Sequence, residues 1–262
     1  MATTLIAELD SLIQLMEAEI PANINSLANR RLEKRLQREL ANYFKLLADA
    51  FPYDKLDEIY YKHVKETRGT EMGNVLDLLL AALTSNLTYR LNGHLVTIYT
   101  AASAEMISWG KTKAGIPIAY EGPPIEQAIE WAEKHCATLV TQMNEETKRR
   151  LAQAISEGIE QKRGIPGLAR DIRREFADMT KRRSEMIART ETADALSQAS
   201  LDRMRDMDID GKEWVGNDPC DICVENESEG IVPVDHVFSS GHDRPPAHPN
   251  CECALAPARL SR

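Results

Sequence analysis

The chain has 262 residues, of which 41 are acidic and 32 are basic, so its formal net charge is −9 at neutral pH. With 43% hydrophobic residues, it is long enough to bury a core without covalent cross-links. Its 13 glycines and 12 prolines are too few for a collagen-like or broadly disordered chain. The longest apolar run, residues 75–83, is interrupted by Asp77 and is far shorter than the roughly 20 residues that cross a bilayer. We therefore expect no membrane span. The N-terminus carries Glu8 and Asp10 and does not resemble a secretion signal, which predicts a cytoplasmic origin.

The first half of the chain has the periodicity of helices. Apolar residues recur at helical spacing over residues 5–47, and Pro21 divides this stretch into two predicted helices. Residues 75–109, rich in leucine and poor in charge, predict a buried helix that ends at Gly110. Glycine and proline then gather in residues 115–124, which cannot continue a helix. We therefore predict a helical N-terminal domain over residues 1–114, available for docking a partner, and a linker over residues 115–124.

The second half changes character near its end. Residues 125–158 have helical periodicity, Gly164 and Gly167 predict a turn, and helical spacing resumes to about Met207. From residue 211 onward turn-forming residues are frequent, and only residues 213–215 and 231–238 have the pattern of strands. The predicted fold class is α+β. A mostly helical body carries a small, irregular, β-containing module at the C-terminus, at residues 211–257 of a domain that spans residues 125–262.

Basic residues cluster between residues 148 and 183, while the chain around residues 202–229 is strongly acidic. Such clusters can neutralise DNA phosphates. Each cluster nevertheless has acidic neighbours, which is typical of a solvated helix face, and this interpretation is favoured. If the clusters do contact DNA, the candidate residues are Lys181, Arg182 and Arg183.

Four of the five cysteines lie in the C-terminal module, as a C-x-x-C pair and a C-x-C pair with a histidine three residues ahead of the latter. Clustered cysteines in a reducing compartment more often bind metal than form disulfides, and thiolate and imidazole ligands suit zinc. A module with few apolar residues also needs such a cross-link. A structural zinc site is therefore predicted, with a disulfide or redox form and unligated thiols as alternatives. The candidate ligands, of which four are needed, are Cys220, Cys223, His248, Cys251 and Cys253.

Two residues outside that set have simpler interpretations. Cys136 stands alone on a predicted helix and is most simply a small core residue. Trp214 is predicted to anchor the core of the C-terminal module, with a base-stacking platform as the less favoured alternative.

Two enzyme classes use the same motifs. A zinc deaminase combines P-C-x-x-C with an upstream H-x-E, and no such H-x-E is present. An HNH-type nuclease has a similar order of parts, in which His236 would activate water and a divalent ion would hold the phosphate. Prolines at 245, 246 and 249 stand where the last helix of such a site would run. We assign no catalytic residue and keep the nuclease as the alternative function.

The order of motifs as a whole resembles a known family. An I-A-R-T-E-T stretch at residues 187–192 precedes K-E-W at 212–214 and the first cysteine pair, and P-P-A-H-P-N-C-E-C closes the series at residue 253. This order resembles the phage Mu protein F-like family of minor head or head morphogenesis proteins, over about residues 125–257. The residues that carry the family motif here, besides the cysteines, are Arg189, Glu191, Trp214 and Asp218. Relatives usually carry arginine between the last two cysteines, where this chain has Glu252.

The resemblance implies a non-enzymatic role in building the phage head. It implies a minor capsid protein in the head interior, made in the host cytoplasm and associated with the portal protein and with other capsid or scaffold proteins. It further implies a part in DNA packaging or ejection, with weak, non-specific DNA binding as one possible contact.

Overall fold

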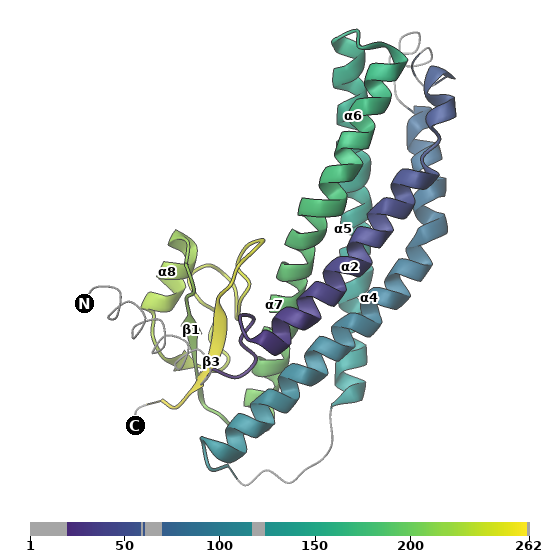
Figure 1. Ribbon diagram of the computed structural model, residues 1–262. Coiled ribbons are helices and arrows are strands. Elements are labelled where there is room, and N and C mark those ends of the chain that lie inside the picture. Colours follow the sequence, from purple (N-terminus) through teal and green to yellow (C-terminus); the bar gives the residue numbers. More distant parts are fainter. Residues whose placement is uncertain (1–19, 59, 61–69, 117–123, 261–262) are drawn as a thin grey trace, which may run out of the picture. The chain divides into compact units, whose positions relative to one another are not determined.

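The computed structural model describes residues 20–58, 60, 70–116 and 124–260. Figure 1 shows long helices followed by a small sheet. In chain order the elements are α2 (Leu27–Ala50), η1 (Tyr53–Lys55), α4 (Thr70–Thr112), α5 (Ile125–Glu160), α6 (Gly164–Asp178), η2 (Met179–Arg183), α7 (Ser184–Asp206), β1 (Gly211–Val215), α8 (Asp221–Ser228), β2 (Val232–Pro233) and β3 (Ala254–Ala258). The predicted class, α+β and mostly helical, is confirmed.

The start of α2 has a local cause. Ser26 precedes the helix, and its Oγ accepts a hydrogen bond from the backbone N–H of Asn29 at 3.1 Å, which satisfies one of the N–H groups that a helix start leaves without partners. Ahead of it, residues 20–26 are not helical, in agreement with the predicted break near Pro21. The helix predicted before that break lies outside the described residues. So does most of the predicted linker.

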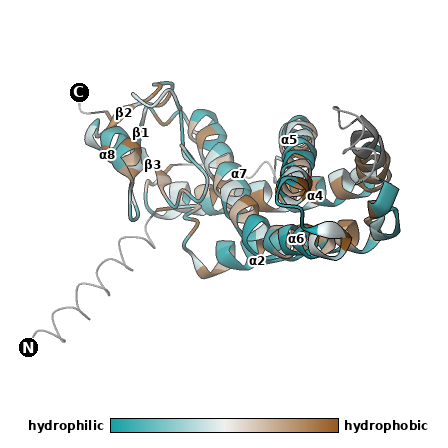
Figure 2. Cartoon of the chain, turned by 90° about the horizontal axis from the view of Figure 1, so that it is seen from above, coloured by the Kyte–Doolittle hydropathy of each residue, from teal (hydrophilic) through white to brown (hydrophobic). Residues whose placement is uncertain are grey.

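The leucine-rich helix α4 is buried along one stripe, whereas the sequence predicts a buried helix. Its buried residues recur at helical spacing, and Leu78 and Tyr89 on other faces are 75% and 82% exposed. High leucine content therefore overstated the burial. Among the described residues no helix is both long and apolar enough to span a membrane. Figure 2 shows hydrophilic residues interspersed with hydrophobic ones along the helices.

One helical stretch runs from Gly164 to Asp206 through a π-helical segment, η2, which periodicity did not predict. The predicted turn is confirmed at Gly164, which has a φ of 62°, and is absent at Gly167. The chain turns at residues 161–162, where Lys162 has a φ of 53°, and Gly164 already begins α6. Gly167 lies inside α6, where a Cβ would approach Cβ of Arg163 to 2.9 Å. Its small size is needed for close packing and not for a turn.

The described chain forms two compact units, each discontinuous in sequence. One comprises Met1–Arg35, His94–Glu130 and Met186–Arg262, and the other comprises Leu36–Gly93 and Trp131–Glu185. Each unit takes segments from both sides of residues 115–124, because helices α2, α4 and α5 contribute residues to both units. The predicted domains, residues 1–114 and 125–262, are continuous stretches of chain and so differ in kind from these two units. That division stays a prediction.

The second unit is helical and is held by contacts between distant segments. Tyr43 on α2 donates a hydrogen bond to Asn144 on α5 at 2.8 Å, and Asn144 donates in turn to Thr84 on α4 at 3.0 Å. Arg150 on α5 lies 2.8 Å from Glu175 and 2.6 Å from Asp178 on α6. These partly buried hydrogen bonds and ion pairs hold α2, α4 and α6 against α5 within this unit.

The first unit contains a three-stranded antiparallel sheet of order β2-β1-β3. Strand β1 matches the predicted run at residues 213–215. Of the run predicted at residues 231–238, only Val232–Pro233 is a strand, because the segment after Pro233 turns back and His236 binds Glu229. Neither β3 nor α8 was predicted from the sequence. The sheet, α4 and α7 enclose a core of Met106, Leu201, Met204, Ile209, Trp214, Cys223, Val232, Phe238, Cys251, Cys253 and Leu255.

Candidate metal centre

Two structural elements present the cysteine pairs of the module. Cys220 is the N-cap residue of α8, and Cys223 lies in its first turn, so the C-x-x-C pair occupies a helix start instead of an isolated tight turn. The second pair, Cys251 and Cys253, lies directly ahead of β3, which pairs with β1 along its whole length. The sheet thus holds the two pairs next to one another.

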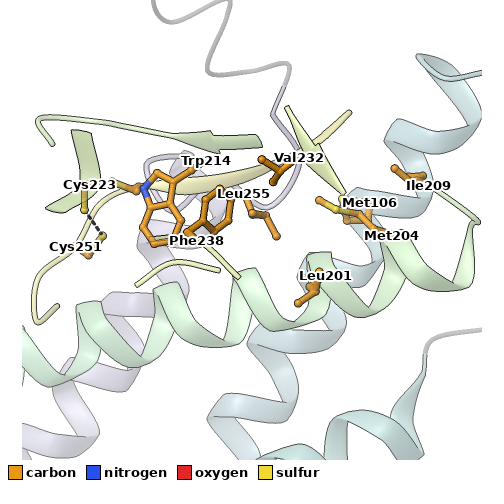
Figure 3. Close-up of a cluster of buried hydrophobic side chains, with 11 residues drawn as sticks. Met106, Leu201, Met204, Ile209, Trp214, Cys223, Val232, Phe238, Cys251 and Leu255 are labelled. Carbon is orange, nitrogen blue, oxygen red and sulfur yellow. Dashed lines mark hydrogen bonds between the residues drawn. The ribbon is translucent and has the colours of Figure 1, made fainter. Parts of the chain in front are cut away.

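The five candidate donors form two overlapping groups. Within each group the ligand atoms lie within 4.8 Å of one another: Cys220, Cys223 and His248 in one, and Cys223, Cys251 and Cys253 in the other. Cys223 belongs to both. Its Sγ lies 3.3 Å from Nε2 of His248 and 3.8 Å from Sγ of Cys251, and Figure 3 shows Cys223 and Cys251 turned toward each other beside Trp214. The structure therefore brings the other four predicted donors to within 4.8 Å of the sulfur of Cys223.

The histidine has the orientation of a metal ligand. Nδ1 of His248 lies 2.9 Å from the carbonyl oxygen of Pro249. A carbonyl oxygen only accepts hydrogen bonds, so Nδ1 carries the proton and Nε2 presents its lone pair to the sulfur of Cys223. Metal-binding histidines are commonly oriented in this way, by a hydrogen bond from the second ring nitrogen.

The sulfur environment differs from one cysteine to the next. Cys223, Cys251 and Cys253 are buried, while Cys220 is exposed. Burial raises the pKa of Cys223. The thiol of Cys251 donates a hydrogen bond to Cys253, which lowers the pKa of Cys253 and raises that of Cys251.

Trp214 supplies a further observation at the same place. Its side chain is fully buried, and its indole N–H lies near enough to Cys253 to lower the pKa of that thiol, without forming a hydrogen bond of ordinary geometry. Figure 3 shows this nitrogen on the side of the ring that faces the cysteines. A metal-bound thiolate is a better acceptor than a thiol for such an N–H, so this donor fits a cluster that holds an ion. Trp214 is also a core residue, as the sequence predicts, and its ring packs edge-on against Phe238 with centroids 5.2 Å apart.

The donor set determines what the cluster can do chemically. Thiolates and one imidazole suit zinc and other soft or borderline metals and do not suit magnesium or calcium. The cysteines and histidine can thus hold a metal ion between α8 and the segment ahead of β3. Cys136, on α5 in the other unit, is buried and takes no part.

The remaining family-motif residues lie on α7 and in the turn ahead of α8. Arg189 on α7 lies 2.8 Å from Glu252, the residue between the last two cysteines. Asp218 is exposed and has a φ of 47°, a backbone conformation that aspartate tolerates better than most residues, in the turn from β1 to α8. Glu191 lies on α7, two residues after Arg189.

The three candidate DNA contacts do not share a face. Arg182 and Lys181 are exposed, whereas Arg183 is only 6% exposed and donates to Thr147 at 2.8 Å and to the carbonyl oxygen of Met143 at 3.0 Å. Burial lowers the pKa of Arg183 to about 10. The guanidinium of Arg183 points into the helical unit and is not available to a phosphate. The candidate DNA contacts that remain are Lys181 and Arg182.

This placement predicts the salt dependence of DNA binding. The double variant Lys181→Ala, Arg182→Ala should reduce the slope of log affinity against log salt by about 2, since each phosphate contact contributes about 0.9. Arg183→Met should leave the slope unchanged. Fluorescence anisotropy with a labelled duplex at several salt concentrations measures both, and an equal slope in wild-type and double variant would contradict the assignment.

The structure also places His236, the residue on which the nuclease alternative depends. Its Nε2 lies 2.7 Å from Oε2 of Glu229, whose other oxygen accepts a hydrogen bond from the backbone N–H of Ser239 at 2.7 Å. His236 belongs to neither group of potential metal ligands found among the described residues. The observed contacts give it the role of closing the loop between α8 and residue 239.

The fold and the site define a class: a largely helical protein whose small antiparallel sheet carries a Cys/His cluster able to hold a metal ion. Residues 145–256 match the family model described as phage Mu protein F like protein, which confirms the resemblance seen in the motifs. The match covers less than half of the chain. Searches of curated proteins and of solved structures gave no significant match.

Proposed function

We propose that this protein is a minor capsid protein that associates with the portal inside the phage head and acts in capsid assembly and in DNA packaging or ejection. The observation that carries the proposal is the family match over residues 145–256, which includes α7 and the whole Cys/His cluster. A second support is the geometry of the module, in which the cysteines and His248 gather around Cys223 while His236 lies apart from them and contacts Glu229. We propose no catalytic activity.

The metal of the cluster, in this proposal, is a structural zinc ion. Cys223 lies on α8, whereas His248 and Cys251 come from a segment 25 and 28 residues further along the chain. When zinc is bound, it supplies a cross-link between α8 and the strand β3, which lowers the freedom of the loops between them. Four of the five donors complete a tetrahedral site, and Cys223 is the donor that both groups share.

Co-expression tests the assembly role. The protein and the portal protein of the same phage should co-purify at low salt, and mass spectrometry of assembled heads should find this chain in a few copies relative to the major capsid protein. The variant Lys181→Ala, Arg182→Ala should still co-purify with the portal. A failure to co-purify together with absence from purified heads would contradict the minor-capsid function.

The nuclease alternative makes an opposite prediction for one residue. His236→Ala should leave the yield of filled heads unchanged, because the histidine holds a loop and activates no water. Purified wild-type protein should also leave supercoiled plasmid intact when incubated with magnesium, manganese or zinc. Metal-dependent cleavage that His236→Ala abolishes would favour the nuclease over the assembly function.

A further inference from the structure

Glu252, the residue between two candidate metal ligands, is held from three directions. Its Oε1 accepts a hydrogen bond from Nη1 of Arg189 on α7 at 2.8 Å. Its Oε2 lies 3.4 Å from Nδ2 of Asn217, in the turn that leads to Cys220, and 3.7 Å from Nη2 of Arg30 on α2. The carboxylate thus joins the C-x-C segment to two helices and to the turn ahead of the first cysteine pair.

Arg189 extends this chain of charges to a buried carboxylate. Its Nε lies 3.5 Å from Oε1 of Glu33 on α2. Glu33 is only 2% exposed, and its Oε2 has no hydrogen-bond partner among the described residues. A buried carboxylate is costly without a compensating positive charge. Glu33 therefore depends on Arg189, and the position of Arg189 depends on Glu252.

Helix α7 fixes the same loop at two further points. The backbone N–H of Asn250 donates to Oγ1 of Thr190 at 3.1 Å. Nη2 of Arg244 donates to Oδ1 of Asp194 at 2.8 Å. The contacts of α7 with residues 244, 250 and 252 each join residues at least 50 positions apart, and they lie on both sides of His248 and of Cys251. The sulfurs on either side of Glu252 are consequently held in place relative to α7 by these contacts.

We propose that Glu252 and Arg189 are positioning residues that couple metal binding to the ordering of the first turns of α2. The coupling rests on the proposed metal centre. When the ion holds Cys251 and Cys253, Glu252 holds Arg189 in contact with Glu33, and the N-terminal end of α2 is stabilised. By thermodynamic reciprocity, contacts that stabilise this network also stabilise the metal-bound form. An arginine at this position would face Arg189 and Arg30, so the glutamate is matched in charge to its surroundings.

The first test measures the rate of zinc release from the full-length, zinc-loaded protein into a chromogenic chelator. Glu252→Gln preserves the size of the side chain and removes its charge, and we expect release about tenfold faster than in wild-type, as for the loss of one charge-assisted hydrogen bond. Arg30→Gln, at the more exposed contact, should accelerate release about twofold. The matched control is Glu225→Gln, an exposed position on α8 two residues from Cys223, which should leave the rate unchanged.

The second test measures the reciprocal effect by hydrogen exchange. Removal of zinc from wild-type protein should increase exchange of the α2 amides in residues 27–35, whereas in Glu252→Gln those amides should already exchange faster with zinc bound. Equal release rates in wild-type, Glu252→Gln and Glu225→Gln, with one zinc per chain in each, would overturn the coupling alone. Wild-type protein that binds no zinc would overturn the metal centre, and the coupling with it.

Discussion

Replacement of Cys223 by serine is expected to abolish zinc binding and to unfold the C-terminal module. Cys223 is the one donor shared by both groups, and its sulfur lies within 3.8 Å of both His248 and Cys251. Without it, neither group keeps three donors within 4.8 Å of one another, and the sulfur that lies close to both groups is lost, so the remaining donors are not arranged for a structural zinc site. Because the energy of metal binding contributes directly to folding in small metal-stabilised modules, the loss of the ion should also expose the surrounding core.

Elemental analysis of protein purified without added metal provides the measurement. Wild-type protein should contain one zinc per chain, and Cys223→Ser should contain less than about a tenth of that amount. Hydrogen exchange should show loss of protection in β1 and β3 of the variant, with α5 and α6 unchanged. Cys136→Ser, the same replacement at the buried cysteine of α5, is the control and should keep its zinc. Wild-type protein free of zinc, with all five thiols titratable in the native state, would contradict the prediction.

Trp214→Ala is expected to lower the free energy of unfolding of its unit by about 3–5 kcal/mol, as for other large-to-small replacements of fully buried aromatic residues. The side chain is fully buried in the core formed by the sheet, α4 and α7, and its ring packs edge-on against Phe238. The substitution removes these contacts and leaves a cavity beside the cysteines. The variant should therefore also release zinc faster than wild-type.

Urea denaturation followed by far-ultraviolet circular dichroism measures this effect, since the signal does not depend on the replaced tryptophan. Trp131→Ala is the control. Trp131 is partly exposed on α5, where it stacks on His135, and its loss should cost no more than about 1 kcal/mol. A Trp214→Ala variant as stable as Trp131→Ala would contradict the central place of this residue in the core.

The sequence-based predictions succeed for elements whose pattern is local in the sequence. Helices α2, α4 and α5 agree with periodicities at residues 27–47, 75–109 and 125–158, because the spacing of apolar residues depends on which face a helix buries. The short strands and α8 are less accessible to this reasoning. Strand β3, with the sequence A-L-A-P-A, has no alternating pattern and exists because β1 pairs with it. Likewise, α8 is too short for its periodicity to stand out from a loop.

The spacing of apolar residues and the order of motifs are enough to predict the helical class, the Cys/His motif and the family that residues 145–256 match. Which of the candidate metal ligands lie close together depends on the tertiary fold, because the contacts of Cys223 with His248 and Cys251 join residues 25 and 28 positions apart. The tertiary fold also determines which of two neighbouring arginines is exposed to solvent. Arg182 is exposed, while Arg183 enters the helical unit and binds residues 36 and 40 positions away. Glu252 finds Arg189 across 63 residues. Local spacing determines the face a residue occupies on its own element, but packing between distant segments determines what that face meets.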